Sequence, residues 1–120
     1  MSIADSELYG TEPINRDEVE RRLELTADWR LPSKRELRAF KEHHRLRDMA
    51  DDLIAAADIH DESWILLERM WSGFPDPPPF VFIAFRSNGS QVCAADLDGL
   101  SPSWRLPDGV PFKYSPDKST

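Results

Sequence analysis

Residues 80–97 read FVFIAFRSNGSQVCAADL and give the clearest structural signal in the chain. The dipeptide Asn88-Gly89 is preferred in two-residue hairpin loops, because both central residues of a type I′ turn need positive φ. Such a turn fixes the pairs across the hairpin: Ser87 with Ser90, Phe85 with Val92, and Ala84 with Cys93. The stretch therefore predicts an antiparallel β-hairpin with a defined register.

Apolar side chains occupy both faces of this predicted hairpin. Successive residues of a strand alternate between faces, so one face carries Val81, Ile83, Phe85, Val92 and Ala94. The other face carries Phe80, Phe82, Ala84, Cys93, Ala95 and Leu97. A ribbon with one solvated face would alternate apolar and polar residues. We therefore expect helices to cover one face, and a second copy or an obligate partner to bury the other near Phe80, Phe82 and Cys93.

Three helices are expected before the hairpin, over about 15–28, 33–57 and 59–72. Asn15 with Glu18 resembles a capping box at the first helix, and Ser33 with Glu36 forms a full one at the second. No glycine or proline follows Ser33 until Gly73, so no helix-breaking residue interrupts the expected second helix. The third helix would be apolar on nearly all sides, so it would have to be central or covered.

The predicted fold class is therefore α+β, with three N-terminal helices packed on a small antiparallel β-hairpin sheet and an irregular C-terminal tail. Residues 1–14 are expected to form a flexible acidic tail, and residues 15–120 a single domain. A chain of 120 residues buries roughly two thirds of its unfolded surface, which is enough for a self-supporting core. The proline-rich stretch 75–79 is expected to be a stiff, extended linker.

A four-residue segment occurs twice. Trp29-Arg30-Leu31-Pro32 recurs as Trp104-Arg105-Leu106-Pro107, and nothing around the two copies matches. Four residues are too few for a structural repeat. Two interpretations remain open: coincidence or shared local geometry, and a duplicated docking element.

The composition excludes several classes of protein. Charged residues make up 31% and hydrophobic residues 40%, values typical of a soluble globular chain and not of a disordered one. No run of ~18 apolar residues occurs, so no membrane span or membrane partner is expected. The acidic start of the chain lacks a signal-peptide pattern. Cys93 is the only cysteine, so no internal disulfide can form. These features favour a cytoplasmic protein.

A basic stripe is the most informative functional pattern. Lys34, Arg38, Lys41 and Arg45 follow one another at spacings of four, three and four residues. On a helix that turns ~100° per residue they would share a stripe about 60° wide. The apolar stripe opposite would contain Ala39, Leu46, Ala50, Leu53 and Ala57. Because the formal net charge is −7, the stripe stands out as either a solvated face or a partner-binding site, and we take it as the candidate site.

No pattern in the sequence is specific for catalysis, although enzymatic activity is not excluded. Cys93 lies in an apolar strand, where a thiol stays protonated. His43 and His44 would diverge by about 100° on a helix, so they could not bind one metal from one helical face. None of the five glycines forms a phosphate-binding loop. We therefore predict no catalytic residue, no metal site and no cofactor.

The function that the sequence favours is a small acidic cytoplasmic module for protein interaction or regulation, without catalytic activity. Accessory, toxin-neutralising and phage-type modulator proteins fit this description. Its partner would be another protein or a second copy of the chain.

Two alternatives stay open. Three helices followed by a hairpin resemble a winged helix, with residues 29–31 as the short first strand and Asn88-Gly89 as the tip of the wing. That resemblance implies nucleic-acid binding, but the helix that would read the groove carries only Arg69 as a base. The second alternative is a small enzyme or ligand binder built from four tryptophans and a nearby histidine: Trp29, Trp64, Trp71 and Trp104 with His43, His44 or His60.

Overall fold

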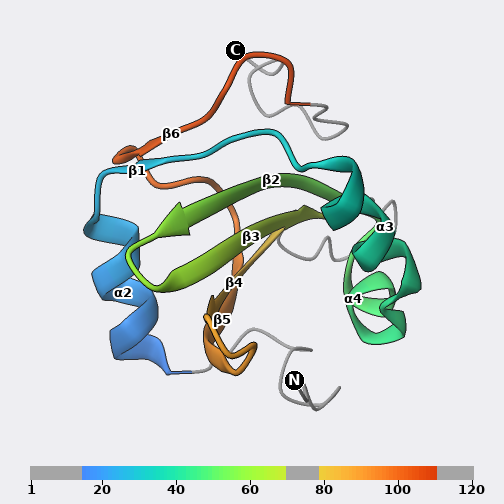
Figure 1. Ribbon diagram of the computed structural model, residues 1–120. Helices are drawn as coiled ribbons and strands as arrows, with labels where there is room; N and C mark the ends of the chain where they lie inside the picture. Colours follow the sequence, from blue (N-terminus) through green and yellow to red (C-terminus); the bar gives the residue numbers. More distant parts are fainter. Residues whose placement is uncertain (1–14, 70–78, 111–120) are drawn as a thin grey trace.

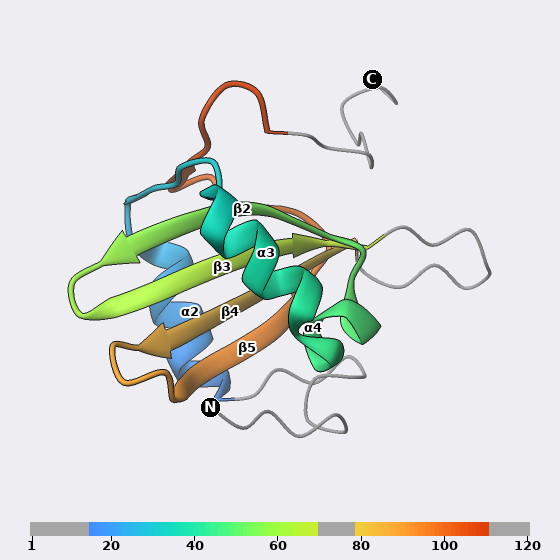
Figure 2. The same ribbon diagram turned by 45° about the vertical axis from the view of Figure 1, so that its right-hand side comes forward.

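The computed structural model describes residues 15–69 and 79–110. Helix α2 (Arg16–Glu24) lies on one face of a four-stranded sheet, and helices α3 (Lys34–Glu42) and α4 (His44–Met49) lie on the other. Figure 1 shows the sheet between α2 and the α3–α4 pair, and Figure 2 shows α3 crossing in front of the strands. The predicted flexible tail, residues 1–14, lies outside the described residues, as do residues 70–78 and 111–120.

The main sheet is an antiparallel meander in which each strand pairs with the next along the chain. Its strands are β2 (Asp52–Ile59), β3 (Glu62–Glu68), β4 (Phe80–Arg86) and β5 (Gln91–Leu97). A second, two-stranded sheet joins β1 (Ala27–Asp28) to β6 (Trp104–Arg105) in parallel. This small sheet pairs the two residues before the first copy of the recurrent segment with the first two residues of the second copy.

The hairpin predicted over residues 80–97 is confirmed, with one change at its turn. Ala84 pairs with Cys93 as expected, but Phe85 pairs with Gln91 because of an irregularity beside the loop. Gly89 has φ 90°, whereas Asn88 does not have positive φ. The loop is therefore not the predicted type I′ turn; a glycine with positive φ beside a bulge is typical of a longer loop. The bulge places Val92 on the same side as Cys93.

The helices predicted over 33–57 and 59–72 are wrong. Helix α3 ends at Glu42, and residues 52–68 form the hairpin of β2 and β3. Residues 53–57 are all buried, because both faces of β2 are covered. A continuous apolar run of this kind fits a buried strand and a buried helix equally well by periodicity. The chain reverses direction between β2 and β3 at His60, whose φ is 54°. Because the residue at this position is neither glycine nor proline, no residue type in the sequence indicated a turn here.

The predicted fold class therefore needs correction. Strands contain more of the described residues than helices do, and the sheet has four strands where two were expected. The first helix ends at Glu24, not at residue 28, because Ala27 and Asp28 form β1. The tail expected to be irregular contains β6. Helices on both faces of a meander replace three helices on one face of a hairpin.

Two apolar cores lie on the two sides of the sheet. Beneath α2 the core contains Val19, Trp29, Ile54, Trp64, Leu66, Phe80, Phe82, Cys93 and Trp104, among others. Beneath α3 and α4 it contains Phe40, Leu46, Leu53, Leu67, Val81, Ile83, Phe85 and Ala94, among others. The expectation that both faces of the 80–97 hairpin are covered is confirmed, and the chain supplies the cover itself. Among the helices of the described residues, none has the length and apolar character needed to cross a bilayer.

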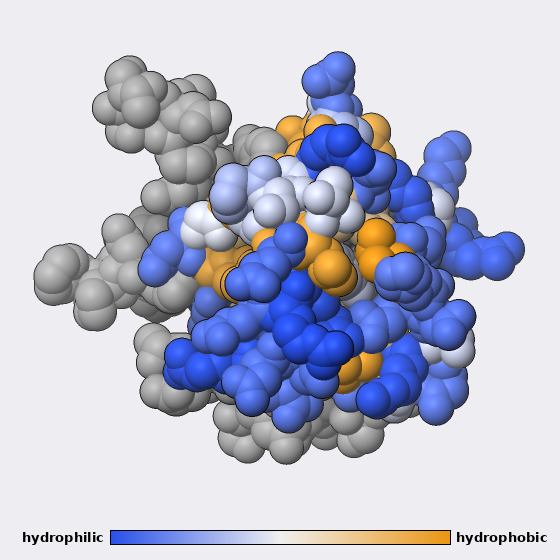
Figure 3. Space-filling model, turned by 90° about the vertical axis from the view of Figure 1, so that its left-hand side faces the viewer, coloured by the Kyte–Doolittle hydropathy of each residue, from blue (hydrophilic) through white to orange (hydrophobic). Residues whose placement is uncertain are grey.

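The side of the molecule formed by α2 is mostly hydrophilic, with small hydrophobic spots (Figure 3). Its exposed residues include the charged side chains Arg16, Asp17, Glu20, Arg21 and Glu24. Only Val19 of this helix is fully buried. The charged side of α2 therefore faces away from the sheet.

Candidate functional site

The predicted partner-binding residues lie mainly on α3, and the sequence fixes where this helix begins. The Ser33 hydroxyl accepts a hydrogen bond from the backbone N–H of Glu36 at 3.1 Å. The Glu36 carboxylate in turn accepts one from the backbone N–H of Ser33 at 2.8 Å. The capping box predicted here is confirmed. Phe40, 7% exposed, anchors the helix in the core.

Arg30 ties the start of α3 to the sheet. Its guanidinium donates to both carboxylate oxygens of Glu36, at 2.7 and 2.8 Å, and to Asp58 of β2 at 3.0 and 3.1 Å. The hydrogen bonds from Arg30 lower the pKa of Glu36 from 4.5 to about 2. This carboxylate is therefore ionised at any physiological pH. Sequence reasoning missed Arg30, because the pair it forms with Asp58 bridges segments far apart in the chain.

The long helix expected to carry the whole basic stripe is broken at His43. The backbone of His43 is extended, and its Nδ1 accepts a hydrogen bond from the N–H of Leu46 at 3.3 Å, which caps α4. Of the predicted inward stripe, Leu46, Ala50, Leu53 and Ala57 are buried. Ala39 is wrong, because it is exposed and Phe40 is buried in its place. Arg45 belongs to α4, and its side chain lies outside the described part of the structure.

Lys34, Arg38 and Lys41 remain together on one exposed face of α3. The helix turns ~100° per residue, so their side chains fall within an arc of about 60°. In the described residues neither these three nor Arg35 forms an ion pair. By contrast, Arg22, Arg30, Arg69 and Arg105 each bind a carboxylate. The bases of α3 thus differ from most others in having no acidic partner within the described chain.

Leu37 lies beside these cations. It is three residues after Lys34 and is 36% exposed, one of three large hydrophobic residues that are exposed in the described part of the chain. The i, i+3, i+4, i+7 spacing of Lys34, Leu37, Arg38 and Lys41 places all four on one side of the helix. We refer to these four residues as the α3 face. The sequence spacing alone would have identified Leu37.

The residues expected to form an oligomer interface lie inside the chain. Phe80 is 1% exposed, and Phe82 and Cys93 are fully buried under α2 and the tryptophans. Burial raises the pKa of the Cys93 thiol to about 11. The hairpin face that was expected to need a second copy is covered by α2 and the tryptophans of the same chain. A dimer through these residues therefore remains a prediction that would require α2 to leave the sheet.

The three described tryptophans come together in the core, whereas the histidines expected beside them lie before and after β2. Trp29, Trp64 and Trp104 pack around Phe82 in the core, with ring centroids 5.0–6.3 Å apart. Trp71 lies outside the described residues. His43 and His44 lie where α3 meets α4, and His60 lies in the loop at the far end of β2. A strand of eight residues spans ~26 Å, so these histidines are far apart.

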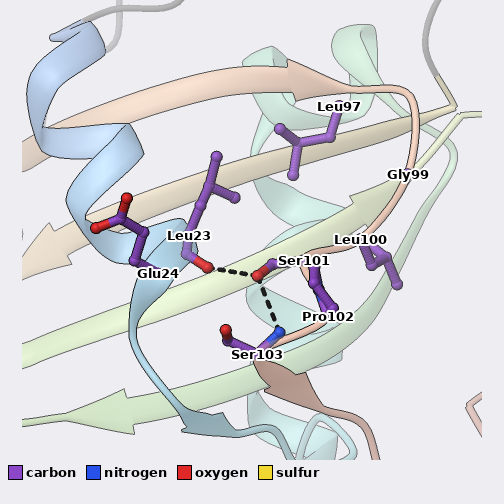
Figure 4. A pocket seen from close by; sticks show the side chains of 8 residues that line it. All are labelled: Leu23, Glu24, Leu97, Gly99, Leu100, Ser101, Pro102 and Ser103. Atoms are coloured by element: carbon purple, nitrogen blue, oxygen red, sulfur yellow. Dashed lines mark hydrogen bonds between the residues drawn. The ribbon is translucent and has the colours of Figure 1, made fainter.

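A hollow of about 400 Å³ lies between the C-terminal end of α2 and the loop after β5. Leu23, Leu97 and Leu100 form its apolar lining, while the Glu24 carboxylate points away from them (Figure 4). The Ser101 hydroxyl donates to the carbonyl of Leu23 and accepts from the N–H of Ser103. Its hydrogen bonding is therefore used within the fold. Nothing in this hollow indicates a particular ligand.

The winged-helix arrangement is excluded by the fold, because the helix that would enter a DNA groove is strand β3. Among the side chains that the structure describes, which leave out that of Asp48, no group of three metal-binding residues lies close enough to hold an ion. Comparisons with protein family models, with curated proteins and with solved structures find no match to this chain. Function is therefore inferred from the chain's own residues.

Proposed function

We propose that this protein is a small cytoplasmic interaction module, and that the α3 face binds an acidic surface of a protein partner. The observation that supports this proposal is the charge contrast on the molecule. Lys34, Arg38 and Lys41 are exposed and lack ion pairs in the described residues, although the chain as a whole carries a net charge of −7. An acidic partner would satisfy these cations and would be guided to them during encounter.

The partner proposed is a protein and not a nucleic acid. Leu37 offers an apolar contact beside the cations, which suits a protein surface better than a phosphate backbone. Glu42, exposed on the same helix, and the net charge of the whole chain oppose any acidic partner. They oppose a nucleic acid more strongly, because its backbone carries a dense and continuous row of phosphate charges. Binding through this face needs no catalytic group, and the proposal assigns none.

Three defined proteins test this proposal by affinity capture from cells that produce the protein. One is the wild type. The α3 reversal carries Lys34→Glu, Arg38→Glu and Lys41→Glu. The charge control carries Arg21→Glu, Arg86→Glu and Arg105→Glu, which are exposed bases away from α3. Both variants have the same net charge, so a difference between them reports the position of the charges.

We expect the wild type and the charge control to capture the same acidic protein, and the α3 reversal to lose it. Binding of the purified pair should weaken as salt is raised, because screening removes attraction between exposed charges. A captured protein that binds the α3 reversal equally well would contradict the proposal. Duplex DNA that binds the wild type and not the α3 reversal would replace the protein partner with a nucleic acid.

A further inference from the structure

Helix α2 carries an acidic counterpart to the α3 face. Asp17, Glu20 and Glu24 are exposed, and their spacing of three and four residues places them within an arc of about 60°. Helices α2 and α3 each contain nine residues. We refer to these three acids as the α2 face. Two helices of equal length thus present opposite charges with matching periodicity.

Most of the positive charge on α2 is occupied within the chain. Arg21 donates to both carboxylate oxygens of Glu18, at 2.9 and 3.1 Å. Arg22 binds Glu18 at 2.8 Å and also Glu62, and its side chain is only 11% exposed. Arg16, exposed at the start of the helix, adds a positive charge at one end. The outer side therefore carries more acids than bases, with Arg21, whose side chain is 73% exposed, at the edge of the acidic arc.

The core holds α2 so that its acids point outward. Val19 is 3% exposed against the sheet. The Arg22 guanidinium is fixed by Glu62 of β3, which also accepts a hydrogen bond from the indole N–H of Trp64 at 2.9 Å. Because Arg22 and Val19 both face inward, the α2 face looks to solvent, on the hydrophilic side seen in Figure 3.

An exposed leucine accompanies each charged face. Leu25, which ends α2, is 42% exposed, and Leu37 on α3 is 36% exposed. In the described part of the chain, only Leu31 is a further exposed large hydrophobic residue. Each face therefore combines charge with a modest apolar contact.

We infer that the α2 face of a second copy of this chain is an acidic surface that the α3 face binds, so that copies associate head to tail. This inference rests on the proposed function, because it names the partner of the α3 face. Helices α2 and α3 lie on opposite faces of the sheet. A contact between two different surfaces leaves one of each free at the ends, so further copies can add.

The contact is small, and this sets the conditions of the test. Each nine-residue helix is only ~14 Å long, so the buried area falls below that of a standard stable interface. Association is therefore expected to be weak, to need high protein concentration and to depend on salt. At ~0.1 M salt the Debye length is ~10 Å, which screens the repulsion between whole molecules more than the contact between facing helices.

Sedimentation of the full chain over a range of concentrations tests the inference. The wild type should show an average mass that rises with concentration at ~0.1 M salt. The α3 reversal should stay monomeric. The α2 reversal, with Asp17→Lys, Glu20→Lys and Glu24→Lys, should also stay monomeric. A 1:1 mixture of the two reversals should associate again, because opposite charges then face each other.

Two control variants separate the effect of where the charges lie from the effect of the net charge of the molecule. The charge control keeps the named residues of both faces, and its Arg21→Glu adds an acid beside the α2 face. It should associate at least as strongly as the wild type, although its net charge equals that of the α3 reversal. A variant with Asp61→Lys, Asp98→Lys and Asp108→Lys changes exposed acids elsewhere and matches the α2 reversal in net charge. It should also associate. Should a reversal lose its far-UV dichroism, glutamine at the same positions removes the attraction without adding like charges.

A wild type that stays monomeric at millimolar concentration overturns the inference. So does an α3 reversal that associates like the wild type, or a mixture of reversals that stays monomeric. A monomeric wild type that still captures an acidic protein through the α3 face would leave the proposed function standing and overturn only the self-association.

Discussion

The rings of Trp29 and Trp104 pack with their centroids 5.1 Å apart, and each begins one copy of the recurrent Trp-Arg-Leu-Pro segment. The backbone N–H of Trp29 donates to the carbonyl of Arg105 at 2.8 Å, within the parallel pairing of β1 and β6. Both indoles enter the core beneath α2. The two copies therefore contact each other, and their tryptophans belong to the core of one chain and not to an exposed docking element.

Replacing Trp104 by alanine should lower the free energy of unfolding by about 3–5 kcal/mol, since a buried aromatic side chain leaves a cavity. The variant also loses the hydrogen bond from the indole N–H to the carbonyl of Arg22, 3.0 Å long. Trp104→Phe keeps an aromatic ring and should therefore lower the free energy of unfolding by clearly less than Trp104→Ala does. Urea denaturation measures both. A loss below ~1 kcal/mol for Trp104→Ala would place this residue outside the core.

The parts that the sequence predicted correctly are governed by local signals. The 80–97 hairpin follows from a turn with glycine and from runs of β-branched and aromatic residues. The start of α3 follows from the Ser33 capping box. The three bases on α3 share a face because helical periodicity places them there.

The parts that failed depend on contacts between distant segments. Residues 53–57 contain three alanines, which favour helix locally, yet they form a strand because β3 and both cores enclose them. The pairing of β1 with β6 joins segments near the two ends of the described chain, and no local pattern encodes it. The burial of Phe82 and Cys93 by the chain itself was missed for the same reason. The residues that cover them come from α2 and from both copies of the recurrent segment.

In the loop between β2 and β3, replacing one residue by glycine should stabilise the fold. His60 has φ 54°, a conformation that costs an L-residue roughly 1–2 kcal/mol, whereas glycine adopts it freely at an entropic cost of roughly 0.5–1 kcal/mol. His60→Gly should therefore raise the free energy of unfolding by about 0.5–1 kcal/mol. His60→Ala keeps the Cβ and should give no such gain. Equal effects of the two substitutions in thermal unfolding would argue against strain at this position.

Glu36 should stabilise the fold above its unfolded pKa of about 4.5 and lose this effect as the pH falls towards 2, since its folded pKa is depressed. Glu36→Gln keeps an acceptor for the Ser33 N–H but removes the ion pair with Arg30. This substitution should lower the free energy of unfolding by only about 1 kcal/mol at pH 7, because the pair is partly exposed to solvent. The difference from wild type should shrink between pH 4.5 and 2. A difference that is the same at pH 7 and pH 2 would contradict this role.

Cys93 should react slowly with thiol reagents in the native protein, since burial raises its pKa to about 11 and closes access to the sulfur. The rate should rise sharply in urea, where the chain unfolds. Cys93→Ala should lower the free energy of unfolding by about 1–2 kcal/mol as a small cavity and leave partner binding intact. Rapid labelling under native conditions would mean that α2 opens readily from the sheet.

The most direct measurement of the central claim is an amide chemical-shift map of the ¹⁵N-labelled chain, recorded while the acidic protein that it captures is added. We predict that the largest changes fall on Lys34, Leu37, Arg38 and Lys41, and that they disappear for the α3 reversal but persist for the charge control. Changes centred elsewhere, with α3 unaffected, would contradict the claim that this helix is the binding surface.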